Sequence, residues 1–272
     1  MSSGSSLTPL TPEEDFVKRW LAQIGITAEK VAEDPSRNTC DFRATDSSSL
    51  YWVEVKTRTG DQTLTRELRQ RGEAYRQKTT GYASTMASIF DEAAAQLASL
   101  SDKEPGFEIA FVLCTHPADG DLGFTQVSAT AFGSQDVLDL EDLGAGSKWC
   151  FFFGESTFFK HKRLDAIVTL DAPSGRFTMC VNPYSPRREA FGQSGLYRAF
   201  QKVADEYKVD AILDPAALDK SGRSYWADCT IDRRDVEAVL AFLKTKYGLK
   251  RPKNIVLQQH SAYAVVERKD PK

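Results

Sequence analysis

Residues 40–57, which read CDFRATDSSSLYWVEVKT, decide how the first half of the chain is interpreted. Two segments rich in β-branched and aromatic residues flank the short polar turn at residues 46–49, and this is the pattern of a β-hairpin. When the hairpin is folded symmetrically about the turn, Thr45 pairs with Leu50. The sequence therefore predicts two antiparallel strands whose register follows from the turn.

This register brings two carboxylates together. Asp41 falls opposite Glu54, and Lys56 shares their face because side chains alternate across a strand. Facing carboxylates repel each other unless a cation lies between them, and a lysine beside that cation can orient or deprotonate a water molecule. The residues predict a metal-dependent phosphodiesterase. The alternative is an exposed strand pair in which Lys56 only neutralises one carboxylate.

Asp41 followed by Glu54-Val55-Lys56 resembles the catalytic hairpin of the PD-(D/E)xK nuclease superfamily, with Cys40 where a proline often stands. This superfamily includes restriction endonucleases, Holliday-junction resolvases and repair nucleases. The resemblance covers roughly the first 115 residues. It implies an α/β fold with a restriction-endonuclease-like mixed-sheet core flanked by helices. It also implies hydrolysis of phosphodiester bonds, with DNA favoured over RNA as the substrate.

The same resemblance implies a metal site. One or two divalent ions would be bound by Asp41, Glu54 and the main-chain carbonyl of Val55. Hard cations prefer oxygen ligands, so Mg²⁺ is the expected ion and Mn²⁺ is expected to substitute for it. Lys56 would orient the attacking water or stabilise the negative charge that develops around phosphorus.

The resemblance also implies that two residues on predicted helices belong to this site. Thr11 and Pro12 are helix-start signals, and Glu14 has the spacing of a superfamily glutamate that often completes the metal site. Gln96, in a helix predicted over residues 82–100, matches a glutamine that points into the active site in several branches. Simpler explanations stay open, because acids stabilise helix starts and a polar residue is ordinary near a helix end.

Basic residues follow the hairpin. Arg58, Arg66 and Arg69 are the predicted contacts to the phosphate backbone of DNA. If residues 64–77 form a helix, Arg66, Arg69 and Arg76 lie along one face of it, although a solvated charged helix gives the same pattern. The net charge of −3 and the pI of about 5.8 argue against a protein that coats nucleic acid nonspecifically.

Alternating helical and strand patterns over 272 residues predict the α/β class with one large core or two small ones. We predict a disordered Gly/Ser-rich leader at residues 1–10, a nuclease-like domain at 11–135 and a second, α+β domain of unknown role at 148–272. Because Leu213-Asp214 followed by Tyr225-Trp226 echoes the first hairpin, the second domain could be a degenerate repeat.

The second half is predicted to contain several further elements. A hairpin is expected over residues 163–181, and amphipathic helices over residues 196–207 and 234–247. The expected strand pairs are residues 209–213 with 225–231, and residues 254–258 with 263–267.

Several classes of protein are disfavoured. The five scattered cysteines include no CxxC pair, which argues against a disulfide framework or a zinc site and for a reducing compartment. No membrane span, signal peptide or nucleotide-binding glycine loop is recognisable, so we expect a cytoplasmic protein. The rival to an enzyme is a non-catalytic nucleic-acid-binding or assembly protein that retains a nuclease-like fold. A homodimer or a protein partner bound through the C-terminal half stays open.

Overall fold

A computed structural model describes residues 9–32, 39–58, 62–115, 120–171, 176–227 and 230–264 of the chain. The predicted disordered leader lies outside these residues except for Pro9 and Leu10. None of the helices in these ranges is long and apolar enough to cross a membrane.

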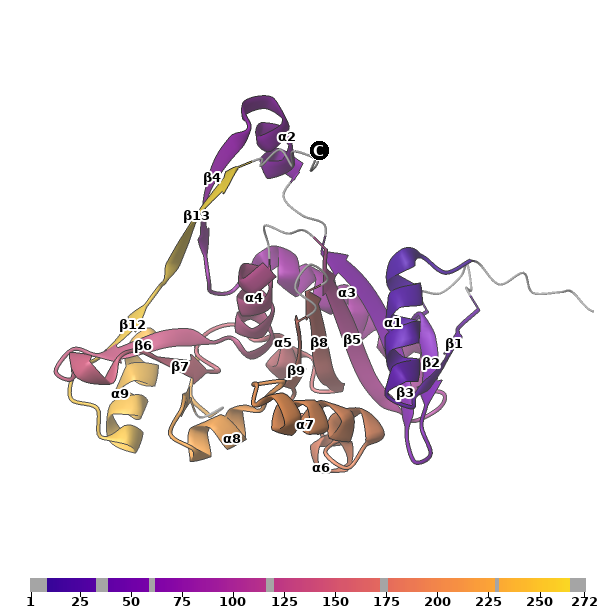
Figure 1. Ribbon diagram of the computed structural model, residues 1–272. Coiled ribbons are helices and arrows are strands. Elements are labelled where there is room, and N and C mark those ends of the chain that lie inside the picture. Colours follow the sequence, from indigo (N-terminus) through magenta and orange to yellow (C-terminus); the bar gives the residue numbers. More distant parts are fainter. Residues whose placement is uncertain are drawn as a thin grey trace, which may run out of the picture.

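A mixed seven-stranded sheet forms the centre of the molecule (Figure 1). Its order is β1-β2-β3-β5-β8-β9-β10, and the neighbours β3, β5 and β8 run parallel. Strands of this kind are covered on both faces, which explains the near-continuous apolar run of β5. The bounds are β1 Thr27–Lys30, β2 Phe42–Thr45, β3 Leu50–Arg58, β5 Phe107–Cys114, β8 Leu164–Asp171, β9 Arg176–Val181 and β10 Ile212–Leu213. The predicted α/β class is confirmed.

Helices cover both faces of this sheet. On β3, Val53 packs in one core with α1 (Pro12–Gln23) and α7 (Gly195–Tyr207). The preceding residue of β3, Trp52, packs on the opposite face of the sheet with α3 (Ser84–Ser101) and α4 (Gly120–Phe132). The alternation of side chains across a strand therefore feeds two separate cores.

The predicted helix start is confirmed. Thr11 is the N-cap of α1, and its hydroxyl accepts a hydrogen bond from the Glu14 main-chain N–H. The Glu14 carboxylate accepts in return from the Thr11 main-chain N–H, which completes a capping box.

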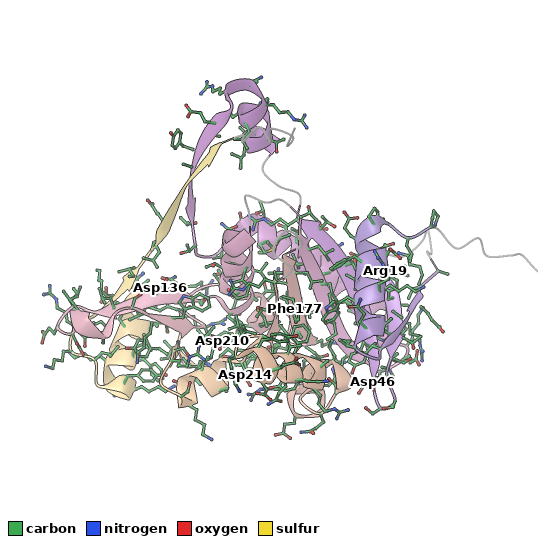
Figure 2. The ribbon with its side chains drawn as sticks, viewed as in Figure 1. Arg19, Asp46, Asp136, Phe177, Asp210 and Asp214 are labelled. Carbon is green, nitrogen blue, oxygen red and sulfur yellow. The ribbon has the colours of Figure 1, made fainter. Side chains whose placement is uncertain are left out.

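The predicted register of the hairpin is also confirmed. Thr45 pairs with Leu50 and Phe42 with Val53, so Asp41 lies immediately before β2 at the level of Glu54. At the turn, labelled in Figure 2, an Asp46 oxygen accepts hydrogen bonds from the Tyr51 hydroxyl (2.5 Å) and the Gly195 main-chain N–H (3.0 Å). These bonds fasten the hairpin to the start of α7.

The central sheet takes strands from both sides of the predicted domain boundary. β8, β9 and β10 all lie beyond residue 148, yet they extend the sheet that begins with β1, β2, β3 and β5. A smaller sheet has the order β11-β7-β6-β12. Its strands are β6 Gln135–Asp139, β7 Lys148–Phe151, β11 Tyr225–Trp226 and β12 Pro252–Ile255. A separate second domain is not confirmed, and neither is the specific restriction-endonuclease-like arrangement.

The remaining helices lie mostly in the second half of the chain. The predicted hairpin over residues 163–181 is confirmed as β8 and β9, and the two predicted helices as α7 and α9. α9 packs against the smaller sheet. The bounds are η1 Leu143–Ala145, α5 Thr157–Lys160, α6 Arg188–Phe191, α8 Pro215–Lys220 and α9 Val236–Tyr247.

Both strand pairs predicted for the second half are wrong. β10 pairs with β9, and β11 pairs with β7. After β10 the chain enters α8 instead of a hairpin turn, because Asp214 caps this helix and Pro215 is its first residue. β12 pairs with β6 and β13 (Gln258–Ala264) with β4 (Glu73–Thr79). The echo of the first hairpin around Leu213 and Tyr225 therefore does not form a hairpin.

An arm consisting of α2 (Gln62–Arg71), β4 and β13 stands away from the central sheet (Figure 1). The helix predicted over residues 64–77 is wrong beyond Arg71. Gly72, with a φ of 72°, follows α2, and the chain continues as β4 because β13 offers a complete antiparallel partner. Arg76 consequently lies on a strand and not on the helix with Arg66 and Arg69.

Candidate active site

The structure brings Asp41 and Glu54 together at the base of the hairpin. Glu54 lies within β3 and is only 2% exposed. One Asp41 oxygen accepts a hydrogen bond from the Val55 main-chain N–H at 2.7 Å, which joins the carboxylate to the neighbouring strand. Glu14, Asp41 and Glu54 are called the carboxylate cluster below.

Lys56 reaches Glu54 and Gln96, as the sequence predicts for one shared site. Its ammonium nitrogen lies 3.0 Å from Glu54 Oε1 and donates a hydrogen bond of 2.6 Å to Gln96 Oε1. The Gln96 amide in turn donates to the Thr39 carbonyl, at 3.2 Å. Gln96 thus holds the lysine from α3, on the face of the sheet that also receives Trp52.

Lys30 is a member of the site that sequence reasoning missed. Its ammonium nitrogen lies 2.5 Å from Glu14 Oε1 and 3.0 Å from Asp41 Oδ1, and its side chain is 10% exposed. β1 pairs with β2 so that Lys30 lies beside Phe42, one residue from Asp41. Nothing in the local sequence marks this lysine, and only the register between β1 and β2 shows that it meets the carboxylates.

The carboxylate cluster is short of positive charge. The three carboxylates of the cluster face two ammonium groups, those of Lys30 and Lys56, which leaves one formal negative charge when all are ionised. The exposed carboxylate of Glu92, 3.9 Å from Lys56, adds to this excess. Glu54 Oε2 is buried and has no hydrogen-bond partner among the described residues. A buried carboxylate oxygen without a partner is costly, so this atom is the natural position for an additional cation or proton.

The pKa values express the same imbalance. Burial, reinforced by the charge of Asp41, raises the pKa of Glu54 to about 8, although Lys56 opposes the shift. Burial also raises the pKa of Asp41, against the hydrogen bond from Val55. Burial acts upward on Glu14 as well, but hydrogen bonds from Lys30 and Thr11 outweigh it and lower the pKa of Glu14. Glu54 is therefore the carboxylate that most resists ionisation without another cation.

The donor set suits a hard divalent ion. Asp41 and Glu54 offer carboxylate oxygens, and the unpartnered Glu54 Oε2 would be satisfied by such an ion. Within the part of the chain that the structure describes, however, no group of three or more His, Cys, Asp or Glu side chains is arranged to hold a metal. The fit therefore depends on Asp41, Glu54 and the main-chain oxygen of Val55 acting together.

The predicted phosphate contacts lie outside the carboxylate cluster. Arg58 is the last residue of β3 and is half-buried. Arg66 and Arg69 are exposed on α2, together with Arg71, in the arm. Arg66 and Arg69 are three residues apart on α2 and therefore share one side of this helix.

A separate open cavity of about 800 Å³ lies between α1, α7 and the strand β9. Trp20, Phe177 and Phe200 are among its lining residues, and their rings pack edge-on or tilted against one another. None of the predicted site residues lines it. This cavity is therefore not part of the carboxylate cluster.

No family model matches the sequence, and no curated protein or solved structure is significantly similar to the chain. The proposals below therefore depend on the geometry and charge of this molecule's own residues.

Proposed function

We propose that the protein is a Mg²⁺-dependent nuclease that hydrolyses phosphodiester bonds in DNA. The observation that carries this proposal is the buried, unpartnered Glu54 Oε2, beside Lys56 in a cluster whose three carboxyl groups outnumber its two lysines. A cluster built only to stabilise the fold would be expected to satisfy every buried carboxylate oxygen.

Each residue has a role in this proposal. Asp41, Glu54 and the main-chain carbonyl of Val55 would hold the ion, and Glu14 is the additional ligand that the resemblance implies. Mg²⁺ in this position would supply Lewis-acid stabilisation of the charge that develops on the phosphoryl oxygens. Lys56, held by Gln96 at 2.6 Å, would orient water or place its positive charge beside the phosphate.

The arm supports the choice of nucleic acid as the substrate. Arg66, Arg69 and Arg71 are exposed on one short helix, whereas the whole chain has a net charge of −3. Exposed arginines bind phosphate oxygens regardless of base sequence. We therefore assign contacts with the DNA backbone to Arg66 and Arg69, and to Arg58 at the end of β3.

The test is cleavage of plasmid, linear and branched DNA in the presence of Mg²⁺ or Mn²⁺. The Glu54→Gln/Lys56→Met variant is expected to lose activity by at least about 100-fold, because it removes a metal ligand and the adjacent cation. Asp210→Asn/Arg223→Met likewise removes one acid and one base, at an exposed ion pair, and is expected to cut like the wild type. Equal activity in both variants would contradict the proposed site.

A non-catalytic nucleic-acid-binding or assembly protein is the second candidate. It is favoured by the two ammonium groups, which already partner Glu14, Asp41 and one oxygen of Glu54 without any metal. DNA binding that is lost in Arg66→Gln/Arg69→Gln, with no cleavage of any substrate and no binding of Mn²⁺, would support this candidate over the nuclease.

A further inference from the structure

Lys30 holds one side of the carboxylate cluster and has no role in the proposed chemistry so far. Its ammonium group bridges Glu14 and Asp41, at 2.5 and 3.0 Å, and its side chain is 90% removed from solvent. It also lies 5.6 Å from the centre of the Phe42 ring. A lysine buried this deeply between two carboxylates occupies a position where a cation is required.

The carboxylate oxygens are not equally available. Glu14 uses one oxygen for Lys30 and the other for the Thr11 main-chain N–H. Asp41 uses one for Lys30 and the other for the Val55 main-chain N–H. Glu54 uses Oε1 for Lys56, while Oε2 has no partner in the described part of the chain. Glu54 Oε2 is therefore the one oxygen of the cluster without a partner in the described residues, and an ion bound there would use a second lone pair of the Asp41 oxygen that faces Val55. Glu14 has its oxygens bound to Lys30 and Thr11, on the other side of Asp41.

We propose that Lys30 is a built-in cation that takes the place of a second divalent ion, so that the cluster binds a single ion through Asp41 and Glu54. This inference rests on the proposed nuclease function and narrows it to a one-ion site. With all groups ionised, as a bound ion requires, the three carboxylates and two lysines carry one formal negative charge, which the charge of one divalent ion already exceeds. A second ion would have to sit beside the Lys30 ammonium and share Glu14 with it.

Glu14 is then a positioning residue for Lys30 and not a metal ligand. The capping box fixes the Glu14 carboxylate, the carboxylate fixes the ammonium group, and the ammonium group holds Asp41. Removing the charge of Lys30 would release one oxygen each of Glu14 and Asp41 toward the cluster. A second hard-cation site would form there from oxygens that the protein normally gives to lysine.

The experiment counts Mn²⁺ ions bound by the metal-free full-length chain, by calorimetry and by the electron paramagnetic resonance signal of free Mn²⁺. The wild type and Lys30→Arg are expected to bind one ion, and Lys30→Met is expected to bind two. Lys30→Met/Glu14→Gln should return to one, because the second site needs Glu14. Two ions or none in the wild type, or one in folded Lys30→Met, would overturn the inference.

Circular dichroism on the same samples identifies variants that have not folded. Lys30→Ala is a second neutral variant if Lys30→Met does not fold, and the count for the wild type can overturn the inference without any variant. DNA cleavage separates this inference from the proposed function. If the wild type binds one ion but cleaves no DNA, the proposed nuclease function is contradicted and the role of Lys30 is still supported. If the wild type cleaves DNA but binds two ions, the nuclease function is supported and the role of Lys30 is contradicted.

Discussion

Two groups of buried carboxylates in this molecule differ in how completely they are satisfied. The carboxylate cluster has three acids, two lysines and one oxygen without a partner. Near the start of β5 and β8, Glu108 and Asp165 are both 1% exposed but lie against two arginines. Glu108 and Asp165, with Arg163 and Arg187, are called the arginine-paired cluster.

The arginine-paired cluster is complete as it stands. Asp165 lies 2.7 Å from Arg187 and also accepts hydrogen bonds from the Ser185 hydroxyl and the Glu108 main-chain N–H. Glu108 accepts from Arg163 and from the Ser101 hydroxyl. The two guanidinium groups match the two buried acids in number, and Arg163 also pairs with the exposed carboxylate of Asp102 at 2.5 Å. The two clusters therefore differ in that buried Glu54 Oε2 has no partner among the described residues, which is the observation behind the proposed metal site.

The largest predicted effect is on the arginine-paired cluster. Arg187→Met should lower the free energy of unfolding by about 3–5 kcal/mol, because it leaves the buried Asp165 carboxylate without its main charge partner. Urea denaturation measures this loss. The control is Arg223→Met, whose partner Asp210 (labelled in Figure 2) is exposed, and which should cost at most about 1 kcal/mol. Similar losses in the two variants would remove the distinction between the clusters.

Between pH 6 and 8 the pH dependence of stability should come mainly from Glu54, because burial raises the pKa of Asp165 only to about 6. In the metal-free folded chain, Glu54 keeps its proton up to a pKa of about 8, whereas in the unfolded chain it ionises near its ordinary value of 4.5. The folded chain therefore binds more protons between these values, so the free energy of unfolding falls as the pH rises from 4.5 to 8. The slope is at most about 1.4 kcal/mol per pH unit.

Urea denaturation at several pH values tests this dependence. Glu54→Gln should flatten the curve between pH 6 and 8 and leave the stability at pH 5 nearly unchanged, because glutamine imitates the protonated acid, whereas the slope below pH 6 to which Asp165 contributes should remain. Glu104→Gln, at a more exposed position, is the control. A curve that keeps its slope in Glu54→Gln would show that another group carries the dependence.

The next effect is stabilisation by metal. At a Mg²⁺ concentration of about 100 times the Kd, binding to the folded chain alone should add about 2.7 kcal/mol to the free energy of unfolding. The addition should disappear in Asp41→Ala and stay unchanged in Asp210→Asn, which alters an exposed acid. Thermal denaturation with and without Mg²⁺ measures it. Equal stabilisation of the wild type and Asp41→Ala would place the ion elsewhere.

Sequence reasoning succeeded where the determining contacts are local. The hairpin register depends on a four-residue turn, and the start of α1 on Thr11 and its neighbours, so both followed from short stretches of chain. It failed where distant strands meet. The predicted helix over residues 64–77 runs past Gly72 into what is strand β4 in the structure. The strand that pairs with β4 is β13, which lies near the other end of the sequence, so local residues do not reveal the pairing.

The residues of the candidate site divide in the same way, into those placed by local sequence and those placed by contacts between distant strands. Asp41, Glu54 and Lys56 lie on one hairpin and were predicted, and Gln96 was added only through the resemblance. Lys30 was missed because its place depends on how β1 pairs with β2. The arginine-paired cluster was missed for a related reason. Glu108 and Asp165 each lie in an apolar run, and Arg187 reaches them from a segment about 20 residues beyond Asp165.

The smallest predicted effect separates the two roles of the α1 start. Thr11→Ala removes the hydroxyl that accepts from the Glu14 N–H, so the free energy of unfolding should fall by about 1 kcal/mol. The bond that holds the Glu14 carboxylate comes from the Thr11 main-chain N–H and survives this change. Mn²⁺ binding should therefore stay at one ion. If Thr11→Ala instead altered the number of ions, the helix cap and the position of Lys30 would be coupled more tightly than these hydrogen bonds indicate.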